Sequence, residues 1–249
     1  MVWSGLRLAI TLLTALPLPG ASAGTPDRRT VAAALYWAPA VGLALGAAAA
    51  SVLLVCRAGH AGPLLSAVLA IALLALATRG LHLDGLADLA DGLGSRQPAA
   101  QALDIMKRSD IGPFGVVTLV LVLLVQVAAL ARADEIGRGP DAIVAAAVAA
   151  RLGVMLACRQ GVPAARSDGL GAMVAGTVHP LAGTLLAAAA LVASAAIGWT
   201  YAVAITVGLI VSLALTAVAV RRLGGITGDV LGAVAETATA VCLLVTAFR

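Results

Sequence analysis

Three aspartates, Asp84, Asp88 and Asp91, lie within eight positions of a sequence that has only 12 acidic residues in 249. Spacings of four and three residues place their carboxylates on one face of a helix. Carboxylates this close repel one another unless a cation lies between them, and oxygen ligands suit Mg²⁺, Mn²⁺ or Ca²⁺ better than zinc or copper. The spacing therefore predicts a divalent-metal site, for Mg²⁺ in the first place, with these three residues as ligands.

The residues that follow the aspartates are suited to binding phosphate. Gly92 and Gly94 are small enough for a phosphate to approach the backbone, and Arg96 can bond phosphate oxygens in pairs. We expect Arg96 and Lys107 to neutralise phosphate charge and Ser95 to contact substrate. An ordinary solvated helix end would explain one aspartate, but not three on one face without Lys partners four residues away.

A glycine-rich segment near the C-terminus, GGITGD at 224–229, is a second candidate for anion binding. Its free backbone N–H groups, before the start of a helix, can hold an anion. Thr227, Gly228 and Asp229 are therefore candidate substrate-binding residues, and Asp229 could also join the metal site. A plain glycine-rich turn with an Asp N-cap is the alternative.

Four further polar residues are candidates because of where they fall. Glu236 and Arg151 lie inside apolar segments, where ionisable groups are costly and usually face the bundle interior, so they could pair or line a substrate cavity. Asp168 lies in a glycine-containing connection and could contact substrate. His82 faces away from Asp84 on a regular helix, so it contacts either substrate or a neighbouring span, or is purely structural.

The elements that must position these residues are membrane helices. Mean hydropathy is +1.05, with 61% apolar and 11% charged residues, far from a soluble domain. Long Ala/Leu/Val runs without strand alternation predict an all-α polytopic bundle forming one catalytic domain over 1–249. The predicted spans are 31–56, 62–79, 112–132, 142–158, 181–199, 201–220 and 229–248.

The first 19 residues allow two interpretations. Arg7 before an apolar run, with ASA at 21–23, could be a secretory signal. The favoured alternative is an amphipathic, interfacial segment that ends at Pro17 and Pro19, with Trp3 at the membrane surface.

Basic residues orient the seven spans, because Lys and Arg are retained on the cytoplasmic side. The connections that precede the first span and follow the even-numbered spans hold most of them: Arg28, Arg29, Arg79, Arg96, Lys107, Arg108, Arg159, Arg166, Arg221 and Arg222. On this topology the aspartate face, the 159–180 connection and the 221–229 connection all meet the cytoplasm. We therefore expect one cytoplasm-facing site built by several connections.

Two other classes of function find no support. Net charge is only +4 and aromatic residues are 3%, so nothing indicates a nucleic-acid surface. The three cysteines are dispersed, without metal-ligand spacing, and we expect them to be packing residues.

The order of motifs is similar to that of a known family. D-x-x-D-G-x-x-S-R at 88–96 resembles the opening of the CDP-alcohol phosphotransferase signature. The longer run HLDGLADLADGL at 82–93, with IMK at 105–107 and IGPFG at 111–115, resembles the cobalamin synthase (adenosylcobinamide-GDP ribazoletransferase) family. PAVG at 39–42 and GGITGDVLGA at 224–233 also resemble motifs of that family.

The resemblance implies that a hydroxyl of α-ribazole, or of its 5′-phosphate, attacks adenosylcobinamide-GDP and releases GMP at the bacterial inner membrane. The reaction would need Mg²⁺ at the aspartates, and one carboxylate of the cluster (Asp91 among them) or Asp110 could accept the hydroxyl proton. Ala/Gly-rich helix faces also permit oligomers. Family members commonly have Asp where this chain has Arg108, and Asp110 follows two residues later. We assign Arg108 no ligand role.

Two alternatives remain at this stage. A CDP-alcohol phosphatidyltransferase shares D-x-x-D-G, but its motif should continue, eight residues after the Arg, with G-x-x-x-D-x-x-x-D. The first Gly of that continuation would stand at position 105, which is Ile here. A polytopic transporter would show paired broken helices in related halves, and the sequence has no such repeat.

Overall fold

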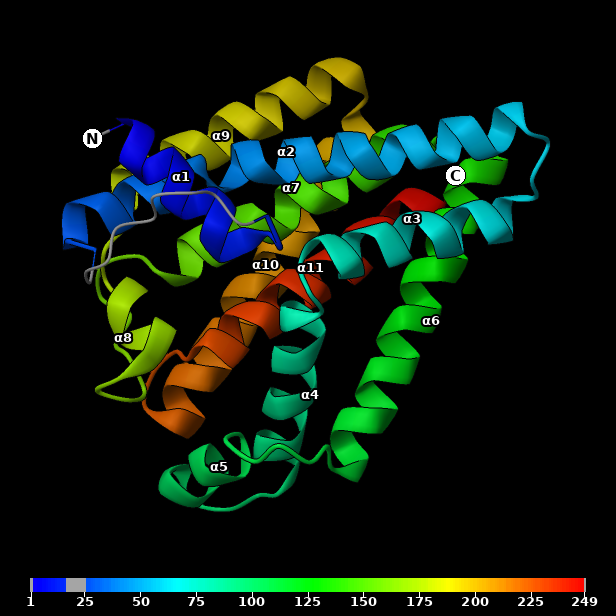
Figure 1. The fold of residues 1–249 in the computed structure, drawn as a ribbon. Coiled ribbons are helices and arrows are strands. Elements are labelled where there is room, and N and C mark those ends of the chain that lie inside the picture. Colours follow the sequence, from blue (N-terminus) through cyan, green and yellow to red (C-terminus); the bar gives the residue numbers. More distant parts are fainter. Residues whose placement is uncertain (1, 17–25, 249) are drawn as a thin grey trace.

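The computed structural model describes residues 2–16 and 26–248, which form helices and no strand (Figure 1). The Pro17, Pro19 and 21–23 features lie outside the described residues. The helices are α1 (Val2–Leu13), α2 (Arg28–Ala58), α3 (Pro63–Ala77), α4 (Leu81–Gly94), α5 (Ala99–Ile105), α6 (Pro113–Glu135), α7 (Gly139–Ala157), α8 (Gly169–Val174), α9 (Pro180–Ile197), α10 (Trp199–Leu223) and α11 (Gly228–Ala247).

Among the described residues, six helices are long and apolar enough to cross a membrane: α2, α6, α7, α9, α10 and α11. The pair α3 and α4 would add a seventh span, but it is bent by 87°. The predicted all-α polytopic bundle is confirmed. The span expected at 62–79 is a helix of only 15 residues, because Arg79 (φ 55°) and Gly80 (φ 68°) turn the chain after it.

Helix α7 forms the centre of the bundle and is buried along nearly its whole length, with α2, α10 and α11 packed around it. The α2 contact depends on glycine. A Cβ on Gly42 would lie 2.6 Å from the Ala147 carbonyl oxygen, and one on Gly46 would lie 2.8 Å from the Val144 Cα. In the membrane, helices associate by such close backbone packing, which accounts for the glycine of the PAVG motif.

The N-terminal helix α1 packs against α2 (Figure 1). A Cβ on Gly5 would lie 2.7 Å from the Ala33 Cβ, so the two helices are in direct contact. Just beyond α1, the Ala15 N–H donates to the Ala77 carbonyl at 2.6 Å, at the end of α3. This segment is therefore part of the bundle rather than an appendage.

Candidate active site

Helices α4 and α11 cross closely at two glycines. A Cβ on Gly85 would lie 2.8 Å from the Cα of Asp229, and one on Gly232 would lie 3.0 Å from the Cα of His82. Larger residues at these positions would push the helices apart. The crossing places the α4 carboxylates Asp84 and Asp88 beside Asp229, the first acidic residue of α11.

The carboxylates form one strongly negative cluster. Asp88 is repelled by Asp84, Asp229 and Asp91 together, and it is attracted by Arg166. Asp84 is exposed and Asp88 half-buried, so both can be reached by a ligand. One guanidinium does not balance four carboxylates, and the excess negative charge favours binding of a cation.

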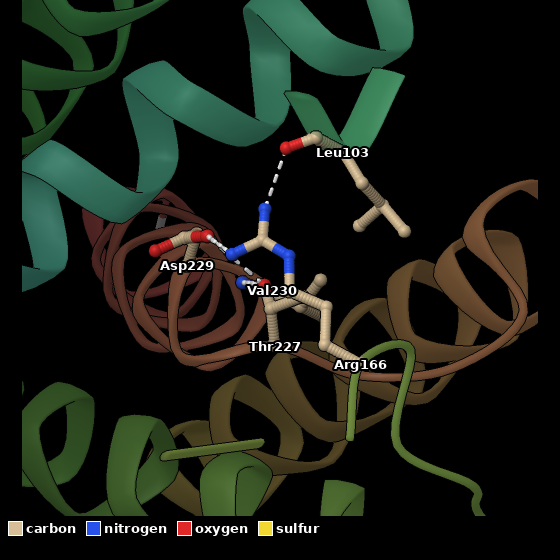
Figure 2. A network of polar contacts seen from close by, with 5 residues as sticks. All are labelled: Leu103, Arg166, Thr227, Asp229 and Val230. Carbon is tan, nitrogen blue, oxygen red and sulfur yellow. Dashed lines mark hydrogen bonds and ion pairs between the residues drawn. The ribbon is translucent and has the colours of Figure 1, made fainter. Parts of the chain in front are cut away.

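Arg166 reaches this cluster from the connection between α7 and α8 (Figure 2). Its Nη2 donates to the Leu103 carbonyl at 2.7 Å, and its Nη1 lies 4.0 Å from Asp229 Oδ2. Both side chains are mostly buried, 19% and 26% exposed. Nothing in the residue pattern pointed to Arg166 as a site residue, and its one signal was that it lies on the same connection as Asp168.

The glycine-rich segment before α11 is held against that connection. The Ala165 N–H donates to the Ile226 carbonyl at 3.0 Å, and the Ile226 N–H donates to the Pro163 carbonyl at 2.9 Å. A Cβ on Gly171 would lie 2.8 Å from the Thr227 Cα. The connections expected to share one face therefore touch directly.

Thr227 caps α11 and also touches the carboxylate cluster (Figure 2). Its Oγ1 accepts from the Val230 N–H at 3.2 Å and donates to Asp229 Oδ2 at 3.1 Å. The N-cap bond gives Thr227 a purely structural role, which was one of the two alternatives for this segment. The second bond holds the Asp229 carboxylate in position.

Two cavities meet at Asp229. The first, of about 240 Å³, is apolar except for His82, Asp84 and Asp229, and α1, α2, α4, α7, α8 and α11 all contribute to its wall. The second, of about 170 Å³, is polar and is lined by Arg166, Asp168, Gly169, Leu170, Gly171, Ile226, Thr227, Gly228 and Asp229. Leu170, Gly228 and Asp229 belong to both walls.

Asp91 is bound differently from the other aspartates. Its Oδ2 accepts from the Gly112 N–H at 2.7 Å and its Oδ1 from the Gly115 N–H at 2.9 Å, and it is only 8% exposed. Gly112 is the N-cap of α6 and Gly115 lies in its first turn, where the N–H groups have no partner within the helix. Asp91 therefore anchors α6 to α4, and this structural role accompanies any role in binding metal.

Four predicted residues lie on the connection around α5 rather than in the two cavities. Arg96, Lys107 and Asp110 are exposed, and Arg96 has a left-handed backbone (φ 54°). Ser95 donates to the Gly92 carbonyl at 2.7 Å, which occupies its hydroxyl at the end of α4.

Glu236 lies in a separate internal pocket. Its Oε2 accepts from Gln126 Nε2 at 2.8 Å, and both residues line a small cavity with His82 and Arg151. The cavity measures about 20 Å³, room for about one water molecule. Arg151 Nε is buried without a hydrogen-bond partner among the described residues. Glu236 is therefore bonded by Gln126, which the sequence analysis had not singled out, and His82 lines both this pocket and the larger apolar cavity.

The donor set fits a hard cation only in part. Among the described residues, no three His, Cys, Asp or Glu side chains are grouped so that they could hold a metal ion. Magnesium, however, is usually held by one or two carboxylates with water and substrate phosphates. Asp84 and Asp229 offer two such carboxylates on the wall of the apolar cavity, and a cation there would also relieve the repulsion that both exert on Asp88.

Comparison with known proteins gives a consistent result. The sequence model of the family described as cobalamin-5-phosphate synthase matches residues 5–247. A Frankia casuarinae protein is 44% identical over 97% of this chain and 93% of its own length, and one from Nocardioides sp. is 40% identical over 98% of both. One from Chlorobaculum tepidum is 40% identical over 98% and 95%. Each is named adenosylcobinamide-GDP ribazoletransferase. No solved structure matches the chain.

Proposed function

Because this chain belongs to the cobalamin-5-phosphate synthase family, we propose that it transfers the adenosylcobinamide phosphoryl group of adenosylcobinamide-GDP to α-ribazole or its 5′-phosphate, releasing GMP. One observation carries the assignment of the site: Asp229 lies where an apolar and a polar cavity meet, with Asp84 on the apolar wall and Asp88 close enough to be repelled by both. An amphipathic donor and an aromatic acceptor need such a mixed surface.

In the reaction, a bond forms between an α-ribazole hydroxyl oxygen and the phosphorus attached to the cobinamide. The bond from that phosphorus to the bridging oxygen breaks, and GMP leaves with the electron pair. The hydroxyl proton passes to a carboxylate of the cluster, for which Asp84 and Asp88 are the accessible candidates. Arg166 stabilises negative charge on the leaving phosphate. Magnesium, when bound by these carboxylates, would screen the phosphate charge that otherwise repels the nucleophile.

Other predicted residues receive supporting roles in the proposal. Arg96 and Lys107, on the exposed connection around α5, would attract the anionic donor from solution. Asp110 is exposed on the same connection, and it remains the alternative base only if the connection moves toward Asp88. Thr227 orients Asp229, and Asp168 lines the polar cavity.

The distribution of basic residues supports a position in the bacterial inner membrane with the site on the cytoplasmic side. Arg28, Arg166, Arg221 and Arg222 belong to the predicted cytoplasmic set, and Arg166 itself reaches the carboxylate cluster. Adenosylcobinamide-GDP is a charged nucleotide conjugate, so a cytoplasm-facing site would give it direct access.

The test is turnover by the purified full chain in lipid nanodiscs with adenosylcobinamide-GDP, α-ribazole and Mg²⁺. We expect GMP release matched by formation of the joined corrinoid, loss of both with EDTA, and recovery on adding Mg²⁺. No GMP from intact substrates would refute the activity. Turnover that persists in EDTA would refute the metal assignment alone. A CDP-alcohol as donor with diacylglycerol as acceptor should give no product, in line with the relatives' names.

A further inference from the structure

We infer that the two substrates reach the reacting phosphorus from opposite sides of Asp229: the apolar cavity holds the acceptor nucleoside, and the polar cavity holds the phosphate of the leaving GMP. This inference rests on the proposed function and divides its site between the substrates. It also assigns α1, which carries none of the charged site residues, to the recognition of the acceptor base.

The apolar cavity has the character of an aromatic nucleoside site. Most of its wall is aliphatic, including Leu12 of α1 and Val154 of α7, while His82, Asp84 and Asp229 supply the ionisable groups among the described residues that line it. Ligand sites commonly combine such an apolar body with a few polar groups that fix orientation. A planar aromatic base would bury its faces against the aliphatic wall, and its ribose hydroxyls would reach the carboxylates.

Size argues against the other large group in the reaction. The cavity is about 240 Å³, below the usual range of roughly 300–1,000 Å³ for sites of drug-sized ligands. A corrin macrocycle with its amide side chains exceeds that range, and its polar rim would meet an aliphatic wall. The corrinoid therefore remains outside both cavities, at the surface where they open.

The polar cavity has the complementary character. Arg166 and the backbone of Gly169, Gly171 and Gly228 line it. A guanidinium can bond two phosphate oxygens, and glycines let phosphate approach backbone N–H groups. Arg166 Nε is buried without a hydrogen-bond partner among the described residues, and a phosphate oxygen beside the guanidinium would give that group a further acceptor. The phosphate of GMP matches these donors.

The shared wall explains why the two cavities meet at the carboxylates. In phosphoryl transfer the attacking and leaving oxygens lie roughly in line on opposite sides of phosphorus. Leu170, Gly228 and Asp229 separate the cavities. A hydroxyl that attacks from the apolar side would displace GMP into the polar side, and the phosphorus would lie over Asp229 in between.

The test separates the two Michaelis constants. Leu12→Trp, which fills the apolar cavity, should raise KM for α-ribazole at least tenfold and leave KM for adenosylcobinamide-GDP within twofold. Arg166→Gln should do the reverse. Leu16→Trp is the matched control, because Leu16 follows α1 but is 61% exposed, and it should change neither constant. Leu13→Trp, on the same wall, is the second variant should Leu12→Trp fail to fold.

Binding without turnover gives an independent readout. We expect α-ribazole alone to bind the wild-type chain in equilibrium dialysis and to bind Leu12→Trp at least tenfold more weakly. If Leu12→Trp instead weakens the donor, the assignment of the cavities is reversed. If it changes neither constant and only displaces co-purified lipid, the cavity is a lipid site and the inference is wrong. A wild-type chain that releases no GMP would refute the proposed function instead.

Discussion

Asp91 has a structural role that connects two sequence motifs. Both of its carboxylate oxygens bond N–H groups of the IGPFG segment, and a Cβ on Gly112 would collide with that carboxylate. A Cβ on Gly115 would lie 2.5 Å from Asp91 Oδ2. The two positions of that segment must be glycine because the Asp91 carboxylate occupies the space that a side chain would need. This contact links the motifs at 88–96 and 111–115.

Replacing Asp91 should lower stability as well as activity. Asp91→Ala removes two hydrogen bonds to a buried, charged acceptor, each worth about 1.5–3 kcal/mol, and leaves N–H groups of α6 unpaired. We expect the unfolding midpoint in detergent to fall by several degrees, together with loss of GMP release. An unchanged midpoint would show that Asp91 does not anchor α6.

Replacing Asp88 should abolish activity, as replacing Asp91 should, but it should not lower stability. It is repelled by three carboxylates, so Asp88→Asn relieves repulsion in the free protein while removing a donor to the cation. We expect GMP release to fall at least about 100-fold, because loss of an outer-shell partner of a metal already costs about 10- to 100-fold and Asp88 would contact the metal itself. The unfolding midpoint should be equal or higher. Asp104→Asn, exposed on α5, is the control and should retain activity. Full activity in Asp88→Asn would remove Asp88 from the site.

At the scale of the elements, the crossing of α4 and α11 decides the geometry of the site. The Gly85 and Gly232 contacts set how closely the aspartate-bearing turn of α4 approaches Asp229. The polar residues of the small internal pocket, contributed by α4, α6, α7 and α11, lie next to this crossing. The glycine contacts and the internal pocket therefore both involve the packing of α4 against α11.

Gly85→Ala should separate the carboxylates without unfolding the bundle. The new Cβ would lie 2.8 Å from backbone atoms of Asp229, which cannot yield as a flexible side chain would. We expect GMP release to fall about 10-fold or more with KM for Mg²⁺ raised. Gly59→Ala is the matched control, because its nearest neighbour would be at an ordinary 3.5 Å. Equal activity in both variants would show that the crossing distance is not critical.

The internal pocket should show coupling between its charges. Glu236→Leu leaves Gln126 Nε2 with only the backbone carbonyl of residue 236, at 3.3 Å, as an acceptor, and it leaves Arg151 without the negative charge in its pocket. We therefore expect a large fall in the unfolding midpoint. Adding Arg151→Met should restore part of that loss, because the unpaired buried charge is then removed. Additive losses in the double variant would show that the two residues are independent.

For the whole molecule, the orientation in the membrane decides from which side the charged donor reaches the site. In a Cys56→Ser background, Ser109→Cys, between α5 and α6, should react with a membrane-impermeant maleimide only in inverted vesicles. In the same background, Ala61→Cys, between α2 and α3, should react only in right-side-out vesicles. The remaining cysteines, Cys158 and Cys242, are buried and should stay unlabelled. The opposite pattern would place the site outside the cytoplasm.

Much of this architecture follows from the sequence because it depends on local information. Continuous apolar runs predicted the all-α polytopic bundle, and the spacing of Asp84, Asp88 and Asp91 predicted a shared helix that α4 supplies. The glycine-rich segment before Asp229 predicted the start of a final helix, and α11 begins there. Hydropathy and helical periodicity are encoded within a few turns of the chain, so they can be read without knowing the partners.

Tertiary structure alone decided which of those residues share a site. Asp229 lies beside Gly85, Arg166 bonds the Leu103 carbonyl, and Asp91 turns to the α6 N-terminus, all contacts between residues distant in sequence or on separate helices. Periodicity shows which face of a helix a residue occupies but not which helix covers that face. It could not reveal the 87° turn between α3 and α4 or the role of Arg166, because both depend on how the helices pack.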